Sequence, residues 1–149
     1  MVQQVSVFLE NESGRLARVT RALGAAGVNM RALMVADTAD FGVVRMLCDT
    51  PRRAVEALEA AGFAASLTRV IAVEVPDRPG GLADVLEVLD GSGMNVEYAY
   101  CFVEPCGDQA TEIKAIDIFR VEDADAAESA LRQAGIGVVE GERLYALDA

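Results

Sequence analysis

The sequence contains an internal repeat, because residues near the start of the chain recur 66 positions later. Aligned at this offset, residues 13–19 match residues 79–85 and residues 27–29 match residues 93–95. Positions 7–29 contain eight identities, which in the first copy are Val7, Gly14, Leu16, Ala17, Val19, Leu23, Gly27 and Asn29. These positions are turn glycines and one helical face, where folding restricts the residue type most. The chain is therefore predicted to fold as two copies of one unit.

The repeat continues beyond this segment with a longer spacing. Residues 54–62 match residues 127–135, so the offset has grown to 73. The second copy therefore holds seven extra residues. We place them in the turn at residues 104–108, which contains proline and glycine.

In the first copy, the spacing of apolar residues predicts a strand, a helix, two strands, a second helix and a last strand, in that order. Val5, Val7 and Leu9 alternate with other residues, which indicates a half-buried first strand. A helix follows from Gly14 and ends at Gly27, with apolar residues recurring on one face. Strands at 28–36 and 41–48 surround a turn at 37–40, a second helix begins at Pro51, and a last strand covers 64–68.

The second copy repeats this order. Strands are expected at 70–75, 94–103 and 113–121, a first helix that ends at Gly93, a second helix at 124–134, and a closing strand at 138–147. The order predicts an α+β fold of two tandem ferredoxin-like βαββαβ modules, each an antiparallel sheet with both helices on one face. We expect module boundaries at 1–69 and 70–149, with no linker between them.

Composition excludes several classes of function. The chain has 24 acidic and 13 basic residues, a formal net charge of -11, which would repel nucleic acid and anionic membranes. It contains no histidine, the commonest general base and metal ligand. We therefore expect no catalytic residues, no metal and no cofactor.

Cysteine spacing and hydropathy indicate a cytoplasmic protein. Cys48, Cys101 and Cys106 match no disulfide or zinc-binding pattern, so we expect reduced thiols. No segment approaches the roughly 20 apolar residues needed to cross a bilayer, and residues 1–10 have the pattern of a strand.

The most distinctive chemistry lies between the first strand and the first helix of each copy, at residues 10–16 and 76–82. A glycine at a helix start allows close approach, and the free N–H groups there suit a carboxylate. Asn11 and Asp77, just upstream, could accept a hydrogen bond from an ammonium group. Alternatively, Asn11, Ser13, Asp77 and Pro79 serve only as turn and helix-start residues.

These residues carry a resemblance to the ACT domain. The sequence Asp77-Arg78-Pro79-Gly80-Gly81-Leu82, followed by a helix and by Gly93-Met94-Asn95, is similar to the ACT pattern Asp-x-Pro-Gly-x-Leu and Gly-(Val/Met)-Asn. The first copy departs from it, with Asn11 for the aspartate and Ser13 for the proline. The resemblance covers nearly the whole chain and is closest to stand-alone tandem ACT proteins of bacteria.

The resemblance implies that an amino acid binds at an interface between paired ACT modules. Carried onto the first copy, the binding positions are Asn11, Ser13, Gly14, Arg15, Leu16, Asn29 and Met30. In the second copy they are Asp77, Pro79, Gly80, Gly81, Leu82, Asn95 and Val96. Asn29 and Asn95 could equally shape the turn after each glycine by bonding nearby backbone.

Apolar strand residues leave two further questions open. Tyr98, Tyr100 and Phe102 share one sheet face, which favours interface packing over a ligand-stacking wall. Residues 33–35 are apolar and point to a branched-chain or aromatic ligand.

The most economical interpretation is an amino-acid-binding regulatory protein that forms a homodimer and acts on a metabolic enzyme or regulator. The alternative is a ligand-free regulatory or scaffold subunit that pairs with an enzyme. Acylphosphatases share the fold and use an arginine after the first strand, where Arg15 stands, but their phosphate-loop pattern is missing. The Cys-x-x-Cys of metal carriers is missing too.

Overall fold

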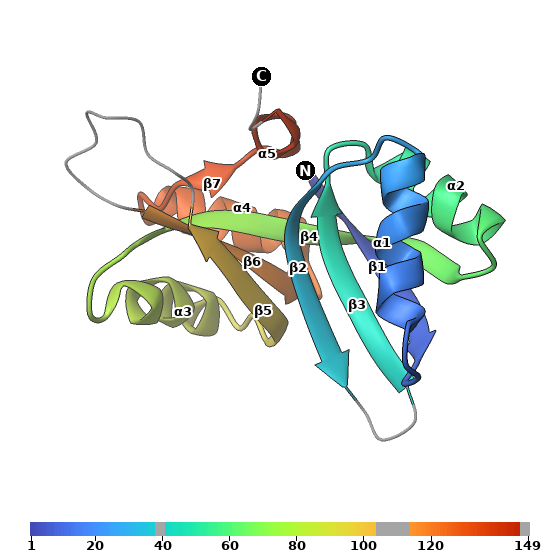
Figure 1. Ribbon diagram of the computed structural model, residues 1–149. Helices are drawn as coiled ribbons and strands as arrows, with labels where there is room; N and C mark the ends of the chain where they lie inside the picture. Colours follow the sequence, from blue (N-terminus) through green and yellow to red (C-terminus); the bar gives the residue numbers. More distant parts are fainter. Residues whose placement is uncertain (38–40, 104–113, 147–149) are drawn as a thin grey trace. The chain divides into compact units, whose positions relative to one another are not determined.

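The computed structural model describes residues 1–37, 41–103 and 114–146 (Figure 1). The chain divides into two compact units. One unit contains Gln3–Thr68 together with Glu142–Ala149, and we call it the first module. The other contains Met1–Val2 together with Arg69–Gly141, and we call it the second module. Each module therefore includes a short segment from the opposite end of the chain.

The first module has the ferredoxin-like order of elements. Along the chain it contains β1 (Val2–Glu10), α1 (Arg15–Ala25), β2 (Met30–Asp37), β3 (Phe41–Cys48), α2 (Pro51–Ala60) and the start of β4 (Ala64–Pro76). Its strands follow the order β2-β3-β1-β4. β3 pairs antiparallel with both β1 and β2, with Glu10 opposite Phe41 and Met30 opposite Cys48.

The second module repeats this order. It contains the rest of β4, α3 (Gly81–Gly91), β5 (Val96–Val103), β6 (Lys114–Val121), α4 (Ala124–Gln133) and β7 (Val138–Val139). β6 pairs antiparallel with β4 and β5, and β7 pairs antiparallel with β4. Both modules are thus α+β with antiparallel sheets, as the repeat predicted.

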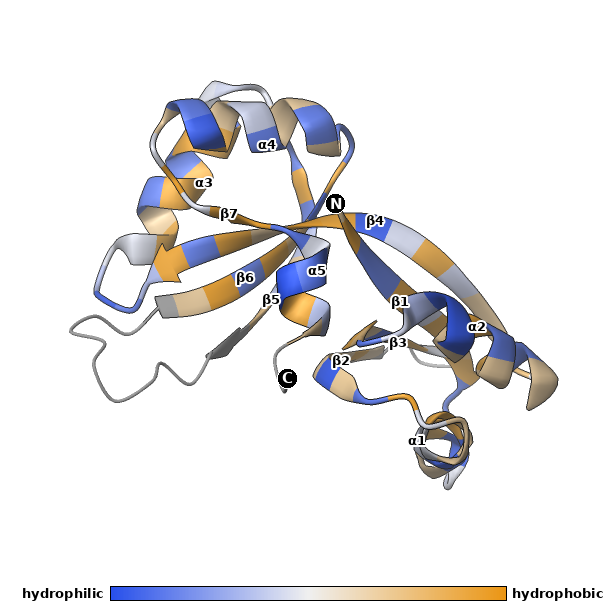
Figure 2. Ribbon diagram, turned by 90° about the horizontal axis from the view of Figure 1, so that it is seen from above, coloured by the Kyte–Doolittle hydropathy of each residue, from blue (hydrophilic) through white to orange (hydrophobic). Residues whose placement is uncertain are grey.

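Each module has its own apolar core between its two helices and its sheet. In the first, Val19, Leu23 and Leu58 of the helices are fully buried against alternate residues of β1 and β3. In the second, Val85, Leu89 and Leu131 occupy the same places over β4 and β6. Hydrophobic and hydrophilic residues alternate along the helices, as this one-sided burial requires (Figure 2).

The chain end departs from the prediction. Instead of a closing strand at 138–147, β7 has two residues and a short helix follows, α5 (Gly141–Tyr145). The prediction was wrong here because the alternation of apolar residues was read as a strand. Glu142, Arg143 and Leu144 are good helix formers, and α5 buries Leu144 completely. The turn at 37–40 and the insertion at 104–108 fall wholly or mostly outside the described residues.

Candidate functional site

The loop between β1 and α1 is a compact turn that ends in a left-handed glycine. The amide of Glu12 donates to the carbonyl of Glu10 at 2.8 Å, and the amide of Arg15 donates to the carbonyl of Glu12 at 3.3 Å. Gly14, the N-cap of α1, has a φ of 84°. A residue with a Cβ would be strained in this conformation, so the turn requires glycine.

The loop between β4 and α3 folds in the same way. The amide of Arg78 donates to Pro76 at 2.9 Å and the amide of Gly81 donates to Arg78 at 3.0 Å. Gly80 is the N-cap, with a φ of 83°. A Cβ at Gly81 would collide with the carbonyl oxygen of Pro76, so the backbone approaches itself more closely than in the first loop.

No side chain caps α1 or α3. Gly14 and Gly80 occupy the two N-cap positions, and the exposed side chains of Asn11, Ser13, Asp77 and Pro79 make no capping hydrogen bond to either helix. An α-helix leaves its first amide groups without acceptors inside the helix, and these groups attract anions. Both loops therefore present an accessible helix N-terminus on which a carboxylate could be held.

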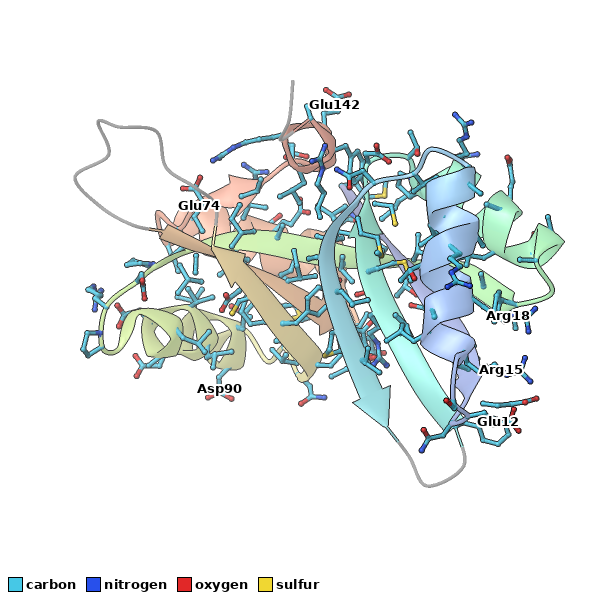
Figure 3. All side chains as sticks on the ribbon, in the orientation of Figure 1. Glu12, Arg15, Arg18, Glu74, Asp90 and Glu142 are labelled. Atoms are coloured by element: carbon cyan, nitrogen blue, oxygen red, sulfur yellow. The ribbon has the colours of Figure 1, made fainter. Side chains whose placement is uncertain are left out.

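Arginine side chains neutralise nearby carboxylates in both loops, from different positions. Arg15 donates to Glu10 at 2.8 Å and to Glu12 at 3.3 Å, and Figure 3 shows Arg15 and Glu12 near each other at the start of α1. In the second loop, Arg78 donates to Asp84 at 2.5 Å and to the carbonyl of Pro79 at 3.2 Å. These exposed ion pairs are weak in water, so an incoming ligand could exchange with them.

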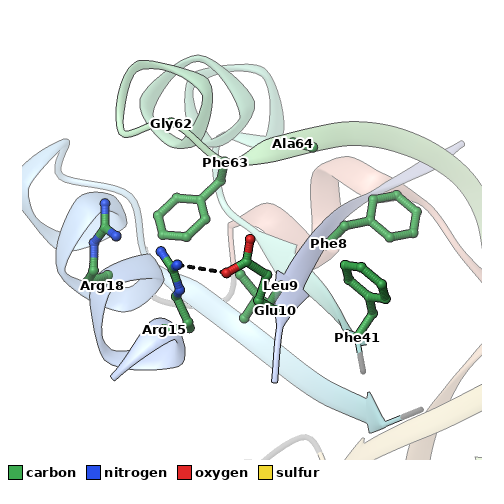
Figure 4. Close-up of a pocket in the computed structure, with 9 residues that line it drawn as sticks. All are labelled: Phe8, Leu9, Glu10, Arg15, Arg18, Phe41, Gly62, Phe63 and Ala64. Carbon is green, nitrogen blue, oxygen red and sulfur yellow. Dashed lines mark hydrogen bonds and ion pairs between the residues drawn. The ribbon is translucent and has the colours of Figure 1, made fainter. Parts of the chain in front are cut away.

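A hollow of about 300 Å³ opens beside the first loop (Figure 4). Its walls combine three aromatic rings with charged groups of both signs. Phe63 lies below Arg18, whose guanidinium is 5.2 Å from the ring centroid. The lining residues are Phe8, Leu9, Glu10, Arg15, Arg18, Phe41, Gly62, Phe63 and Ala64.

The second module has a hollow of about 230 Å³ at the corresponding place. It is lined by Glu74, Pro76, Gly81, Asp84, Val85, Gly135, Ile136 and Gly137. Shifted by 66 or 73 positions, seven of these residues are the repeat equivalents of residues that line the first hollow. The charges differ, because Arg15 and Arg18 are replaced by Gly81 and Asp84. The hollow therefore lies at the same place in both modules, but the charges of its lining residues differ.

The predicted residues do not all meet within one module. Asn11, Ser13, Gly14, Arg15 and Leu16 lie at the start of α1, whereas Asn29 and Met30 lie beyond its other end. With eleven residues, α1 separates the two groups by about 16 Å. Asp77, Pro79, Gly80, Gly81 and Leu82 are separated from Asn95 and Val96 by α3 in the same way. One small ligand could contact both groups only if they came from two modules.

Asn29 and Asn95 have different surroundings. The Asn29 backbone pairs with Asp49, donating to Oδ1 at 3.2 Å and accepting from the amide at 3.0 Å. Asn95 borders an open hollow with Arg69, Arg120 and the first residues of α4. There Arg69 forms a bidentate pair with Asp125, which lowers the pKa of that carboxyl group.

The aromatic walls of the first hollow were not predicted from the sequence. Phe8, Phe41 and Phe63 come from three separate strands or loops, and their convergence depends on the register of Glu10 opposite Phe41. A signal did exist for Phe63, because it follows the helix-ending Gly62 at the repeat equivalent of Ile136. Tyr98 and Tyr100 are half-buried on the sheet face without helices; the Phe102 side chain lies outside the described part.

The thiols of Cys48 and Cys101 are not activated, and Cys106 lies outside the described residues. Cys48 is fully buried, and burial with the nearby Asp49 charge raises its pKa to about 12. Burial also raises the pKa of Cys101. Among the described residues, no cluster of cysteine, aspartate and glutamate has a geometry that could hold a metal ion. No described helix is long and apolar enough to cross a membrane.

The two ferredoxin-like modules and their matched loops define a class, that of tandem repeats of one α+β module. A family model described as an ACT domain pair matches residues 1–147, and the chain belongs to this family. ACT domains bind small molecules such as amino acids, and ACT domain pairs are typically regulatory and non-catalytic.

Solved structures agree with this assignment. Protein BT0572 from Bacteroides thetaiotaomicron is 34% identical, with a TM-score of 0.87 over 97% of this chain and 96% of that one. The ligand-free regulatory subunit of aspartate kinase from Thermus thermophilus is 21% identical, with a TM-score of 0.64 over 89% and 91%. The corresponding subunit from Thermus flavus is also 21% identical, with a TM-score of 0.59 over 89% and 92%. At this identity the two kinase subunits show the shared fold alone. A comparison with curated proteins found no match.

Proposed function

We propose that this protein is a cytoplasmic amino-acid sensor without catalytic activity, and that its two repeats, residues 1–69 and 70–149, supply the ligand-binding loops. The observation that carries the proposal is that both loops end in a left-handed glycine at a helix N-terminus beside a repeat-equivalent hollow. Such a site has the size and the donor groups that a free amino acid requires.

Each part of an α-amino acid has a partner at these loops. The carboxylate binds the free amides at the start of α1 or α3. The ammonium group is accepted by Asn11 or Asp77, and the charged Asp77 makes the second loop the stronger of the two. We assign direct roles to the loop residues Ser13, Gly14, Arg15, Leu16, Pro79, Gly80, Gly81 and Leu82.

The ligand side chain occupies the hollow. Phe8, Phe41 and Phe63 give the first hollow aromatic walls, which favour a branched-chain or aromatic side chain there. The second hollow carries Glu74 and Asp84, and it favours a smaller or more polar side chain. The two loops therefore differ in specificity.

Binding is transmitted by pairing of modules in a homodimer. Because Asn29, Met30, Asn95 and Val96 lie about 16 Å from the loops of their own modules, they complete a site on a paired module. A ligand that bridges two modules favours one arrangement, and a metabolic enzyme or a regulator reads that arrangement.

Thermal unfolding in the presence of each of the twenty amino acids tests this proposal. A ligand at 100 times its dissociation constant stabilises the folded state by about 2.7 kcal/mol. Asp77→Asn should weaken the effect of a ligand held by the second loop, and Asn11→Asp should strengthen that of one held by the first. Asp90→Asn is the matched control, because it makes the same change on α3 away from the loop.

Selective stabilisation that responds to Asp77 or Asn11 but not to Asp90 would support sensing. Twenty unchanged unfolding curves would contradict it, and would favour the ligand-free regulatory or scaffold subunit. Stabilisation that is insensitive to both loop variants would place the ligand elsewhere.

A further inference from the structure

The first module has another hollow, of about 370 Å³, at the start of α2, and we call it the α2 hollow. It is lined by Gln3, Thr50, Pro51, Arg52, Arg53 and Tyr145. The loop between β1 and α1 lies near the other end of α2, where Ala61 accepts a hydrogen bond from Arg18. Since α2 has ten residues, about 15 Å separates the α2 hollow from that end. The α2 hollow is therefore distinct from the amino-acid site proposed above.

Two cationic side chains of the α2 hollow have no partner in the parts of the chain that the structure describes. Arg52 and Arg53 are exposed, and neither side chain forms a hydrogen bond or an ion pair there. Many other arginines do pair with a carboxylate, namely Arg15, Arg69, Arg78, Arg120 and Arg132. In a chain with 24 acidic and 13 basic residues, the α2 hollow thus holds two neighbouring positive charges that no carboxylate neutralises.

The repeat equivalent of α2 is α4, and its first turn shows what this place can bind. Asp123 accepts from the amide of Ala126 at 3.0 Å, which satisfies one of the free amides at the helix start. Asp125 in the first turn forms a bidentate pair with Arg69. Two carboxylates of the chain itself therefore lie at the start of α4.

In α2 both of these carboxylates are absent. Their repeat equivalents are Thr50 and Arg52, and the amide that is capped in α4 corresponds to that of Arg53. No side chain caps α2. The Thr50 hydroxyl donates instead to Asp49, whose carboxylate also accepts from the Asn29 amide. The start of α2 therefore lacks the internal anions of α4 and carries two cations.

Tyr145 adds a hydroxyl group to the α2 hollow. Its oxygen accepts from the Gln3 amide at 2.8 Å, which leaves its own proton available for donation. Burial raises the pKa of this hydroxyl group, so it stays protonated at neutral pH. Guanidinium groups, a phenol and helix amides all donate hydrogen bonds, and none of the lining residues has a carboxylate. The α2 hollow is thus lined by donors and is positively charged.

We propose that the α2 hollow binds the phosphate group of a small molecule, either inorganic phosphate or a phosphomonoester. A phosphate group carries nearly two negative charges at neutral pH, which match Arg52 and Arg53, whereas a carboxylate would leave one arginine unmatched. Guanidinium groups bind phosphate oxygens bidentately, and the free amides of α2 supply further donors. The α2 hollow is in the size range of small-molecule sites, so an organic part fits beside Tyr145. This second ligand goes beyond the amino-acid sensor and does not depend on it.

Isothermal titration of the full chain at constant ionic strength tests the site, with inorganic phosphate, glycerol 3-phosphate and glycerol as probes. The two phosphates should bind, and glycerol should not. Arg52→Gln and Arg53→Gln should each raise the dissociation constant roughly tenfold, because each removes a charged donor group. Arg21→Gln on α1 is the matched control, since Arg21 is also exposed and also lacks a partner among the described residues. It should leave the dissociation constant unchanged.

Thr50→Asp provides a second test, because it installs in α2 the cap that Asp123 forms in α4. In phosphate-free buffer this variant should unfold at a higher temperature than the natural chain. It should no longer bind either phosphate, since its own carboxylate occupies the start of the helix. A variant that gains stability is folded, so its loss of binding has no other origin. Thr50→Ser, which keeps a hydroxyl group, should bind as the natural chain does.

The outcomes separate the possible ligands. Tighter binding of glycerol 3-phosphate than of phosphate would support a phosphorylated metabolite, and equal or weaker binding would support free phosphate. Absence of binding by both probes at millimolar concentrations would overturn the site. Binding that survives both arginine variants or Thr50→Asp, or that Arg21→Gln weakens as much as Arg52→Gln does, would also overturn it. Amino-acid stabilisation measured in phosphate-free buffer decides the sensor proposal separately.

Discussion

Asp117 places a carboxyl group inside an apolar strand. It lies in β6 between Val73 of β4 and Cys101 of β5, and it is 7% exposed. Burial raises the pKa of Asp117, and a hydrogen bond with the Cys101 thiol offsets part of this rise. An acid whose pKa is raised by folding lowers stability once the pH exceeds its unfolded pKa. Ionised Asp117 therefore opposes folding at neutral pH.

We expect Asp117→Asn to raise the melting temperature at pH 7, because the amide removes the buried charge. The advantage should shrink as the pH falls and vanish below about pH 4, where the unfolded carboxyl group is protonated. Asp125→Asn should act in the opposite direction, since Arg69 lowers the pKa of Asp125 and stabilises the charged form. Thermal unfolding between pH 3 and pH 8 measures both. A constant advantage of Asp117→Asn at every pH would argue against a charge effect.

Gly80 adopts a backbone conformation that side chains disfavour. Gly80→Ala should lower stability by about 1–2 kcal/mol, because its φ of 83° strains a residue with a Cβ. Gly91→Ala, at the helical end of α3 with open space around it, should raise stability by about 0.5–1 kcal/mol. Urea unfolding of the two variants provides the comparison. Equal effects would show that the left-handed turn is not required.

Among the elements, α2 and α4 occupy equivalent places but begin differently. Asp123 caps α4 by accepting from the amide of Ala126 at 3.0 Å. Thr50, its repeat equivalent, makes no such bond to α2 and donates to Asp49 instead, at 2.9 Å. The same position is therefore a helix cap in one module only.

Asp123→Ala should lower stability by about 1 kcal/mol through loss of the cap. Thr50→Ala should have a smaller effect, because no capping bond is lost. Urea unfolding measures the difference, and comparable losses would contradict the assignment of the cap.

The repeat made most of these elements predictable. Pro51, the turn glycines and the apolar faces of the helices indicated α1 to α4 to within a few residues, because local sequence decides where a helix begins and ends. α5 was missed, since five residues are too few to show a helical period. The aromatic hollow was missed because Phe8, Phe41 and Phe63 converge only through strand register. The two loops were predicted from the sequence, because the turn at the start of each helix requires a glycine.

Across the whole molecule, α5 completes the module that holds the start of the chain. The amide of Gln3 donates to the Tyr145 hydroxyl at 2.8 Å, and Arg31 donates to the Tyr145 carbonyl at 3.1 Å. Leu144 beside it is fully buried. Residues at the end of the second repeat therefore help to stabilise the first module.

Deletion of residues 142–149 should lower the stability of the first module more than that of the second. Loss of buried Leu144 alone corresponds to about 2–5 kcal/mol. Hydrogen exchange read by mass spectrometry should show faster exchange in peptides from 3–68 than in peptides from 69–141. Tyr145→Phe, which removes one hydroxyl acceptor, should give a smaller change in the same peptides. Equal acceleration in both modules would contradict a local role for α5.

The exchange of chain ends also sets an order of events during synthesis. Residues 3–68 are synthesised before residues 69–141, but their module lacks Leu144 and Tyr145 until the residues of the second module have been made. The second module, in contrast, needs only Met1 and Val2, which precede it in the sequence; the terminal ammonium of Met1 pairs with Glu140 at 2.8 Å. The module encoded first is thus the one finished last, and a nascent chain released early would expose an incomplete apolar core.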